Sequence, residues 1–283
     1  NYDSQLLLSL IMQDSVELEP ILRLVLTPQE LVIQQQGGTW SQIFSEGGLA
    51  DRFPVIVWLL LVQATSLAVL PLGFLVFRGL HDRGYLLSKT LGLLLLAYIP
   101  WILAALKILS FSRSSIYLGL FLLAAVGLAI TATRYREMAS FVRQRWRILA
   151  FEEALFLLAF FVFLAIRWAN PDLWHPFRGG EKPMDFAYLN AVVRSTTIPP
   201  FDPWFAGGYL NYYYYGQFIV ATLIKATGVL PDIAYNLAVP LLFALTAGGA
   251  FSVVYGLTSA LRRRGPGKWA SWGPAAAGIV AVL

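Results

Sequence analysis

Residues 179–217 read GGEKPMDFAYLNAVVRSTTIPPFDPWFAGGYLNYYYYGQ. The stretch follows one apolar run, residues 148–168, and leads into another, residues 209–230. It holds acidic and basic side chains, two Gly pairs, a Pro-Pro step and four consecutive tyrosines. Loops between helices are mostly short, and the longer ones are commonly functional. We therefore expect the connection at residues 169–208 to build a site at the membrane surface.

Apolar composition and long apolar runs predict a membrane protein. The chain is 58% hydrophobic and 13% charged, whereas a soluble domain carries about 25% charged residues. Seven apolar segments can be marked, and most of them approach or exceed the roughly 20 residues that a spanning helix needs. They are residues 54–77, 85–109, 116–133, 148–168, 209–230, 233–258 and 270–283. The expected fold class is therefore all-α, a polytopic transmembrane helical protein with about seven spans.

The order of these segments divides the chain into four parts. Residues 1–53 are interrupted by acids and are expected to form an extracytoplasmic amphipathic segment. Residues 54–168 form a four-span bundle, and residues 169–208 form a long extracytoplasmic loop with a surface helix. Residues 209–283 form three further spans. The chain begins at Asn1 and ends inside an apolar run, so we expect a piece of a longer protein whose last span is truncated.

Arginine clusters predict the orientation, because positively charged loops stay on the cytoplasmic side of a membrane. Residues 134–147 contain five arginines and should be cytoplasmic, which places residues 169–208 outside. One cluster disagrees, since alternation of the spans puts residues 262–268, with three arginines and a lysine, outside as well. Either one span is miscounted or the total charge bias overrides that loop.

Charged residues inside apolar runs are functional candidates by default. Lys89 lies near a predicted cytoplasmic end of its span, where snorkelling explains it. Glu152 and Glu153 are expected to pair with the arginines of residues 134–147. For Lys225, a partner carboxylate, a lipid phosphate and snorkelling are all open.

The composition excludes several kinds of site. The chain has no cysteine, which excludes disulfides, cysteine-ligated zinc and iron–sulfur clusters. Its two histidines, His81 and His175, are far apart and form no metal-binding motif. The formal charge of +5 comes from loop arginines that orient helices. We therefore expect no nucleic-acid partner.

Helix and turn signals place acidic residues in the long loop. Pro183 predicts the start of an amphipathic helix over residues 183–195. Asp185 falls in its first turn, where the helix dipole favours a carboxylate. Glu181 lies four residues earlier, so that the two acids can approach one another or share a cation. The apolar positions recur at spacings of three and four residues at Met184, Ala187, Tyr188 and Ala191.

The second half of the loop combines a capping signal with the tyrosine run. Asp202 followed by Pro203 fits a helix N-cap, and a pure capping role is an alternative to a role in a site. The tyrosines 212–215 are expected to open the next spanning helix and to cover nearly its whole circumference. An aromatic belt at the membrane interface is one interpretation of them. A stacking and hydrogen-bonding surface for a sugar or a polyprenyl-phosphate headgroup is the other.

These motifs carry a family resemblance. GGEKPMDFAYLNAVVRS and PPFDPWFAGGYLNYYYYGQF resemble the signature of the Chlor-Arch-YYY family of polytopic membrane proteins. LHDRGYLLSKTLGLLLLAYIPWIL, residues 80–103, is similar to the family's first-loop pattern, although His81 stands where that pattern has proline. The resemblance covers about residues 54–258. The layout of the family resembles that of GT-C glycosyltransferases, which implies a lipid-phosphate sugar donor and an external catalytic carboxylate.

Under this resemblance the loop residues take distinct roles. Asp185 is the candidate catalytic base, Glu181 orients a partner or binds a divalent cation, and Asp202 is a second helper. Lys182 and Arg194 are candidate phosphate partners, as is Arg178. The donor or acceptor groove would be lined by Tyr212, Tyr213, Tyr214 and Tyr215. No DxD motif is present, so the metal is left unassigned.

The resemblance also implies a location and partners. The protein is expected in the cytoplasmic (inner) membrane of a prokaryote, in contact with membrane lipids, a polyprenyl-phosphate sugar and other membrane subunits. A non-catalytic accessory subunit of a photosynthetic or respiratory membrane complex is the alternative function. A transporter is a third class, and the inverted repeats and broken helices typical of transporters are not visible in the sequence.

Overall fold

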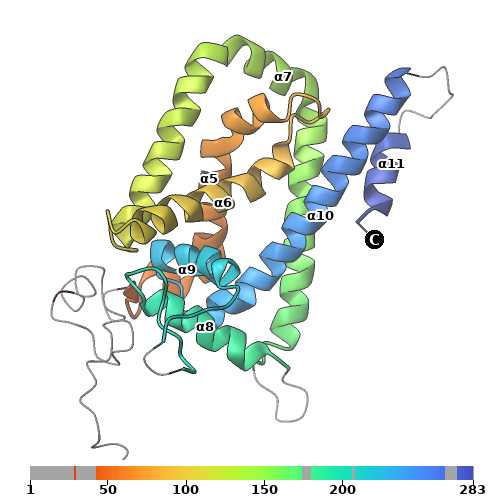
Figure 1. Cartoon of the computed structure of the whole chain (residues 1–283). Helices are drawn as coiled ribbons and strands as arrows, with labels where there is room; N and C mark the ends of the chain where they lie inside the picture. Colours follow the sequence, from red (N-terminus) through yellow and green to blue (C-terminus); the bar gives the residue numbers. More distant parts are fainter. Residues whose placement is uncertain (1–28, 30–42, 174–179, 206–207, 265–272, 283) are drawn as a thin grey trace, which may run out of the picture.

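The computed structural model describes residue 29 and residues 43–173, 180–205, 208–264 and 273–282. In these ranges the chain is all-helical, without a strand, and one antiparallel bridge joins Phe201 and Tyr209. The helices, shown in Figure 1, are α4 (Leu49–Arg52), α5 (Pro54–Val76), α6 (Tyr85–Ala105), α7 (Arg113–Ala169), α8 (Lys182–Arg194), α9 (Tyr215–Thr227), α10 (Pro231–Arg264) and α11 (Gly273–Val280). Most of residues 1–53 lies outside the described residues, so the amphipathic segment expected there stays a prediction.

Four of the described helices are long and apolar enough to cross a membrane. They are α5, α6, α7 and the part of α10 from Pro231 to Leu261. The predicted class, an all-helical membrane protein, is confirmed at this level. The expected count of about seven spans is not reached among the described residues: α11, at the seventh expected span, has 8 residues, and two further differences explain the rest.

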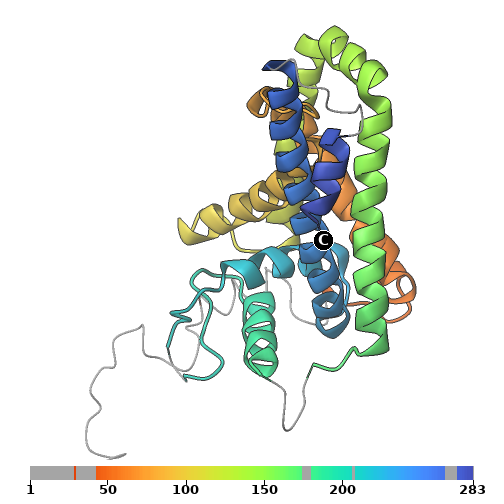
Figure 2. The same cartoon turned by 90° about the vertical axis from the view of Figure 1, so that its right-hand side faces the viewer.

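The first difference is that two predicted spans share one helix. α7 has 57 residues, about 85 Å at 1.5 Å per residue, against a bilayer core of about 30 Å. It rises on one side, turns over at the top and descends on the other side in Figure 1, and Figure 2 shows the descending limb running beside α10. Rings of Phe163 and Phe243, whose centroids are 4.9 Å apart, join these two helices.

Contacts agree with this bent path of α7. Just before its start, the Phe111 N–H donates to the Thr196 carbonyl over 2.8 Å, next to the end of α8. Near its end, Arg167 donates to Asn236 at the start of α10 over 3.0 Å. In its middle, Glu137 lies 3.4 Å from Arg83 in the α5–α6 loop. Both ends of α7 therefore lie near α8 and the start of α10, and its arginine-rich middle lies at the opposite end of the bundle.

The second difference is at residues 209–230, where the expected helical span is wrong. Residues 200–205 and 208–210 pair as a short hairpin, in which Leu210 N–H donates to the Pro200 carbonyl and Asp202 N–H donates to the Gly208 carbonyl. The helix that follows, α9, has 13 residues, fewer than the roughly 20 that cross a bilayer. α9 begins only at Tyr215, after this paired segment.

The short α9 removes the disagreement in the arginine clusters. Because α9 does not cross, α10 begins beside α8 and α9 and runs to the other end of the bundle, as Figure 1 shows. Ser259, near the C-terminal end of α10, lines the same pocket as Arg145 of the α7 bend. The end of α10 and the bend of α7 thus lie at one end of the bundle, which favours a miscounted span over an overriding charge bias.

Two expectations about charged residues in the apolar runs are also corrected. Glu153 pairs with Lys89, whose Nζ lies 2.8 Å from its carboxylate, and accepts a hydrogen bond from Tyr85 over 2.9 Å. Glu152 is fully buried and makes no ion pair with a described arginine. The arginines of the α7 bend point to the loop and to solvent, so the expected pairing with both glutamates is wrong.

Lys225 fits none of its three expected explanations. Its ammonium group is buried and donates to the carbonyls of Phe111 and Ser195 over 2.6 and 2.7 Å. It also lies 4.0 Å from the centre of the Phe111 ring, a cation–π geometry. Lys225 thus ties α9 to the link before α7 and to the end of α8, which holds the helices of the site in place.

Candidate functional site

α8 carries the central acid of the site, Asp185. The helix spans Lys182–Arg194 with Pro183 in its first turn, which confirms the helix expected at residues 183–195. Pro fits this position because the first turn has no use for its missing N–H. The face of α8 that is buried consists of Tyr188, Leu189, Val192 and Val193. The expected Met184, Ala187 and Ala191 are only partly buried, so the buried face is turned from the expected one.

Asp185 lies at the edge of an apolar cavity, which we call the Asp185 cavity. The cavity has a volume of about 420 Å³ and lies between α6, α8, α9 and α10. Among the described residues that line it, Asp185 is the one charged side chain. The lining consists of Thr90, Leu93, Leu94, Asp185, Leu189, Gly216, Gln217, Ile219, Val220, Leu223, Tyr235, Ala238, Val239, Leu241, Leu242 and Leu245. Such a cavity suits a molecule with a long apolar part and a polar end.

The carboxylate of Asp185 has one hydrogen-bond partner among the described residues. Gln217 Nε2 donates to its Oδ1 over 3.4 Å, a long contact. Partial burial raises the pKa of Asp185, the nearby Glu181 carboxylate raises it further, and the Gln217 hydrogen bond lowers it. A carboxylate with a raised pKa is a stronger base than an ordinary one, which is the property that proton abstraction requires.

Gln217 also carries an unused acceptor. Its Oε1 is buried and has no hydrogen-bond partner among the described residues. A buried acceptor without a partner is unfavourable by about 1–3 kcal/mol. A ligand hydroxyl that enters the Asp185 cavity can donate to this oxygen, so Gln217 and Asp185 together offer two acceptors at one place.

The tyrosine run is not helical as expected, because α9 starts only at its last member. Tyr214 and Tyr215 pack inward against α6: Trp101 Nε1 donates to the Tyr214 hydroxyl over 3.2 Å, and the Tyr215 hydroxyl donates to the Leu94 carbonyl over 3.5 Å. Tyr212 and Tyr213 are exposed, Tyr213 to 87%. Half of the run therefore lies against the protein, and the other half is exposed.

Tyr188 joins the acids to the exposed tyrosines. Its ring centroid lies 5.5 Å from that of Tyr212. Burial raises the pKa of the Tyr188 hydroxyl, and Asp202, Tyr212 and Asp185 raise it further. The structure therefore brings Asp185, Asp202 and Tyr212 together around Tyr188, which the sequence interpretation had treated only as a buried position.

Asp202 has a clear local role. Its Oδ1 accepts hydrogen bonds from the backbone N–H groups of Trp204 and Phe205 over 2.8 and 3.1 Å. These bonds cap a turn. The helix whose N-cap was expected at Asp202 is wrong, because residues 203–205 are not helical. A role of Asp202 in catalysis would use its other oxygen.

The basic residues are spread along α8. Lys182 and Arg194 lie at opposite ends of the helix, about 18 Å apart at 1.5 Å per residue. One phosphate therefore cannot bind both side chains, and of the two only Lys182 lies near Asp185. Arg178 lies outside the described residues.

The described residues hold no group of three or more His, Cys, Asp or Glu side chains that could bind a metal ion. Glu181, which is exposed, and Asp185 are two carboxylates at the start of α8. A divalent cation between them would need further ligands from its substrate or from water.

Sequence reasoning missed Gln217, Tyr188 and Tyr235 as residues of the site. Gln217 gives a signal in retrospect, because it is a polar residue just inside an apolar run. Tyr235 gives none, since it lies 50 residues after Asp185 and joins the Asp185 cavity only through the packing of α10.

Most of the site lies within the part of the chain that matches a known protein family. A family model described as an uncharacterized membrane protein (DUF2298) matches residues 95–283. The match covers α8, the tyrosine run and all of the cavity lining except Thr90, Leu93 and Leu94. No curated protein and no solved structure matches the chain.

Proposed function

We propose that this chain, which belongs to the DUF2298 family of uncharacterized membrane proteins, is a membrane glycosyltransferase of the GT-C type. It uses a lipid-phosphate-linked sugar, with Asp185 as its catalytic base. One observation carries the proposal: a carboxylate is the single charged group on the described lining of a cavity that is otherwise almost wholly apolar. A polyprenyl phosphate has the matching form, an apolar chain with a charged end.

The acceptors at the cavity edge support a hydroxyl substrate. The Asp185 carboxylate has one long hydrogen bond, and Gln217 Oε1 has none among the described residues, so both can accept a hydrogen bond from a ligand hydroxyl. The exposed Tyr212, whose ring centroid lies 5.5 Å from that of Tyr188, offers a flat surface on which a sugar stacks. In this arrangement the apolar chain lies in the Asp185 cavity, and the sugar lies over the tyrosines.

The proposed reaction is a single displacement at the anomeric carbon. Asp185 accepts the proton of the acceptor hydroxyl while that oxygen forms a bond to the anomeric carbon. The bond from the anomeric carbon to the phosphate oxygen breaks, and the phosphate leaves with the electron pair. Lys182 stabilises the charge on the leaving phosphate. Glu181 would help to hold a divalent cation, which would supply further positive charge there. Asp202 holds the turn that carries the tyrosine run.

The proposed topology has five crossings, made by α5, α6, the two limbs of α7 and α10. The arginine-rich bend of α7 and the end of α10 face the cytoplasm, as positive charge favours. α8, the hairpin and α9 then lie on the extracytoplasmic side of a prokaryotic inner membrane. The lipid-linked donor approaches the Asp185 cavity from the bilayer.

The alternative function, a non-catalytic subunit of a larger membrane complex, has one observation in its favour. Trp204, Phe205 and Tyr213 are exposed to 64%, 65% and 87% near the hairpin. Aromatic residues exposed in this way are common where another protein binds. In that case the hairpin would be covered by a partner subunit and Asp185 would have no catalytic role.

The test is transfer of a labelled sugar from polyprenyl phosphate by reconstituted full-length protein. Asp185→Asn should lower the rate by about 10²–10⁴, because the amide keeps the shape but accepts no proton. Asp172→Asn is the matched control, since Asp172 is exposed and does not line the cavity. Absence of transfer by the wild-type protein with each common donor, or equal rates for both variants, contradicts the proposal.

A further inference from the structure

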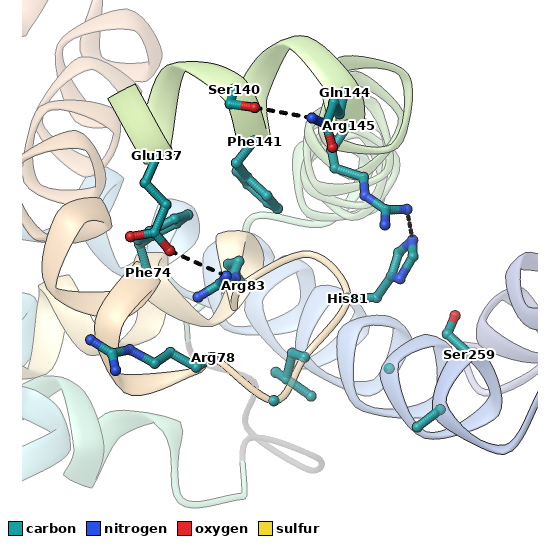
Figure 3. Close-up of a pocket in the computed structure, with 14 residues that line it drawn as sticks. Phe74, Arg78, His81, Arg83, Glu137, Ser140, Phe141, Gln144, Arg145 and Ser259 are labelled. Carbon is teal, nitrogen blue, oxygen red and sulfur yellow. Dashed lines mark hydrogen bonds and ion pairs between the residues drawn. The ribbon is translucent and has the colours of Figure 1, made fainter. Parts of the chain in front are cut away.

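A second cavity lies at the other end of the bundle, where the α5–α6 loop, the bend of α7 and the end of α10 meet (Figure 3). We call it the arginine pocket. Its volume is about 560 Å³, and its lining includes Arg78, Arg83 and Arg145. It shares no residue with the Asp185 cavity, and the proposed glycosyl transfer makes no use of it.

The charge of the arginine pocket is unbalanced. Its described lining contains three arginines and one acid, Glu137. Glu137 lies 3.4 Å from Arg83 and 3.3 Å from Arg134, so it is shared between two guanidinium groups at long distances. Arg78 is exposed and has no hydrogen-bond or ion-pair partner among the described residues. The pocket therefore carries a net positive charge that is available to an anion.

The loop that supplies two of the arginines is held rigidly. Arg83 has φ of 54° and Gly84 has φ of 70°, a left-handed conformation that is unfavourable for arginine. The buried Asp82 maintains it by accepting from the Gly84 N–H over 3.2 Å and from the Ser252 hydroxyl over 2.7 Å. Strained backbone of this kind is concentrated at functional sites. Arg83 is further oriented by the Phe74 ring, 4.6 Å away.

The opposite wall presents a charged guanidinium beside a neutral ring. Arg145 contacts His81 Nε2, and Figure 3 shows this pair at the side of the pocket away from Arg78. A guanidinium has no acceptor, so the imidazole nitrogen must accept and the positive charge stays on Arg145. The hydroxyl of Ser140 and the amide of Gln144, which hydrogen bond to each other over 3.0 Å, add polar groups to the same wall.

We propose that the arginine pocket binds a phosphate group, carried either by an anionic lipid headgroup or by a soluble phosphorylated molecule. Guanidinium groups bind phosphate oxygens with paired, charge-assisted hydrogen bonds. Arginines on two walls allow the anion to be held from both sides. The lipid source places the phosphate at the membrane surface on the arginine-rich side of the protein, where anionic headgroups lie.

Binding to the full chain in detergent tests the proposal with three probes. The probes are inorganic phosphate, dioctanoyl phosphatidylglycerol and, as a zwitterionic control, dioctanoyl phosphatidylcholine. Arg78→Gln and Arg145→Gln should each raise the Kd for the phosphate probe by about 10-fold or more, the loss of one charge-assisted hydrogen-bonding group. Arg143→Gln is the matched control, because Arg143 is exposed on the same bend and does not line the pocket.

The outcomes separate the two sources. A lower Kd for inorganic phosphate than for phosphatidylglycerol supports a soluble phosphate ligand. Tighter binding of phosphatidylglycerol, or binding of phosphatidylglycerol alone, supports a lipid headgroup. No binding of either probe to the wild-type protein overturns the proposal. An equal loss in Arg143→Gln and Arg78→Gln also overturns it, since the effect would then be one of surface charge. Unchanged thermal unfolding of Arg78→Gln without ligand shows that the fold is retained, and Arg78→Lys should keep part of the affinity.

Discussion

The two cavities at opposite ends of the bundle differ in how they use charge. The arginine pocket gathers three guanidinium groups. Two come from the α5–α6 loop, which the buried Asp82 holds in place, and one comes from the bend of α7. The Asp185 cavity has one carboxylate on an apolar lining, and that carboxylate has one long hydrogen bond. An abundance of fixed charge suits the binding of an ion. A single loosely held acid beside apolar surface suits a group that changes its protonation state during a reaction.

Asp82, beside the arginine pocket, and Asp185, at the edge of the Asp185 cavity, are acids with different surroundings. Asp82 is buried, and burial raises its pKa while hydrogen bonds from Ser252 and Gly84 lower it. Asp185 is half-buried at the start of a surface-exposed helix. The first acid organises a loop, whereas the second is placed to meet a ligand. Mutation of both acids therefore tests the comparison directly.

The largest effect is expected on stability at Asp82. Asp82→Ala leaves the Ser252 hydroxyl and the Gly84 N–H without their acceptor, a loss of about 2–4 kcal/mol of unfolding free energy. Asp185→Asn should leave stability nearly unchanged. Denaturant unfolding of both variants in the same detergent measures the difference, and equal stability losses would contradict the assignment of a structural role to one acid and a chemical role to the other.

A smaller effect is expected when the Asp185 cavity is filled. Ala238→Phe places a ring in the cavity lining and should raise KM for a long-chain polyprenyl donor by about 10-fold, the loss of roughly two buried methylene groups. KM for a short-chain donor should not change. Ala129→Phe, on an exposed face of α7 away from the cavity, is the control. A similar KM change for both chain lengths would show that the cavity does not hold the chain.

The smallest effect is expected on the pH profile of transfer. The base must be deprotonated, and the raised pKa of Asp185 means that activity falls as pH decreases through a value above the ordinary aspartate range. Glu181→Gln removes a cause that raises this pKa, so the acid limb of kcat/KM should move to lower pH. Gln217→Ala removes the hydrogen bond that lowers it, so the limb should move to higher pH. Shifts in the same direction for both variants would exclude Asp185 as the titrating group.

Sequence signals a few residues long predicted the elements that depend only on neighbouring residues. Pro183 and the spacing of apolar residues predicted α8 to within a residue at each end. At Asp202 the capping side chain was predicted correctly, but the helix expected after it does not form. These signals act over a few residues of backbone, so a neighbouring helix does not alter them.

Signals that depended on apolar length alone failed at α9. Residues 209–230 are apolar enough for a span, but residues 208 and 210 pair with residues 202 and 200, and α9 begins only at Tyr215. Hydropathy measures apolar length and does not show at which residue a helix begins.

What the sequence by itself determined is the class of the protein, the start of α8 and the presence of acids and tyrosines in one loop. Tertiary structure alone decided that Glu153 meets Lys89, that Lys225 ties α9 to Phe111 and Ser195, and that Gln217 meets Asp185. Composition and periodicity depend on single residues and their near neighbours. The two cavities depend on contacts between helices distant in sequence, and only the packing of the bundle brings those side chains together.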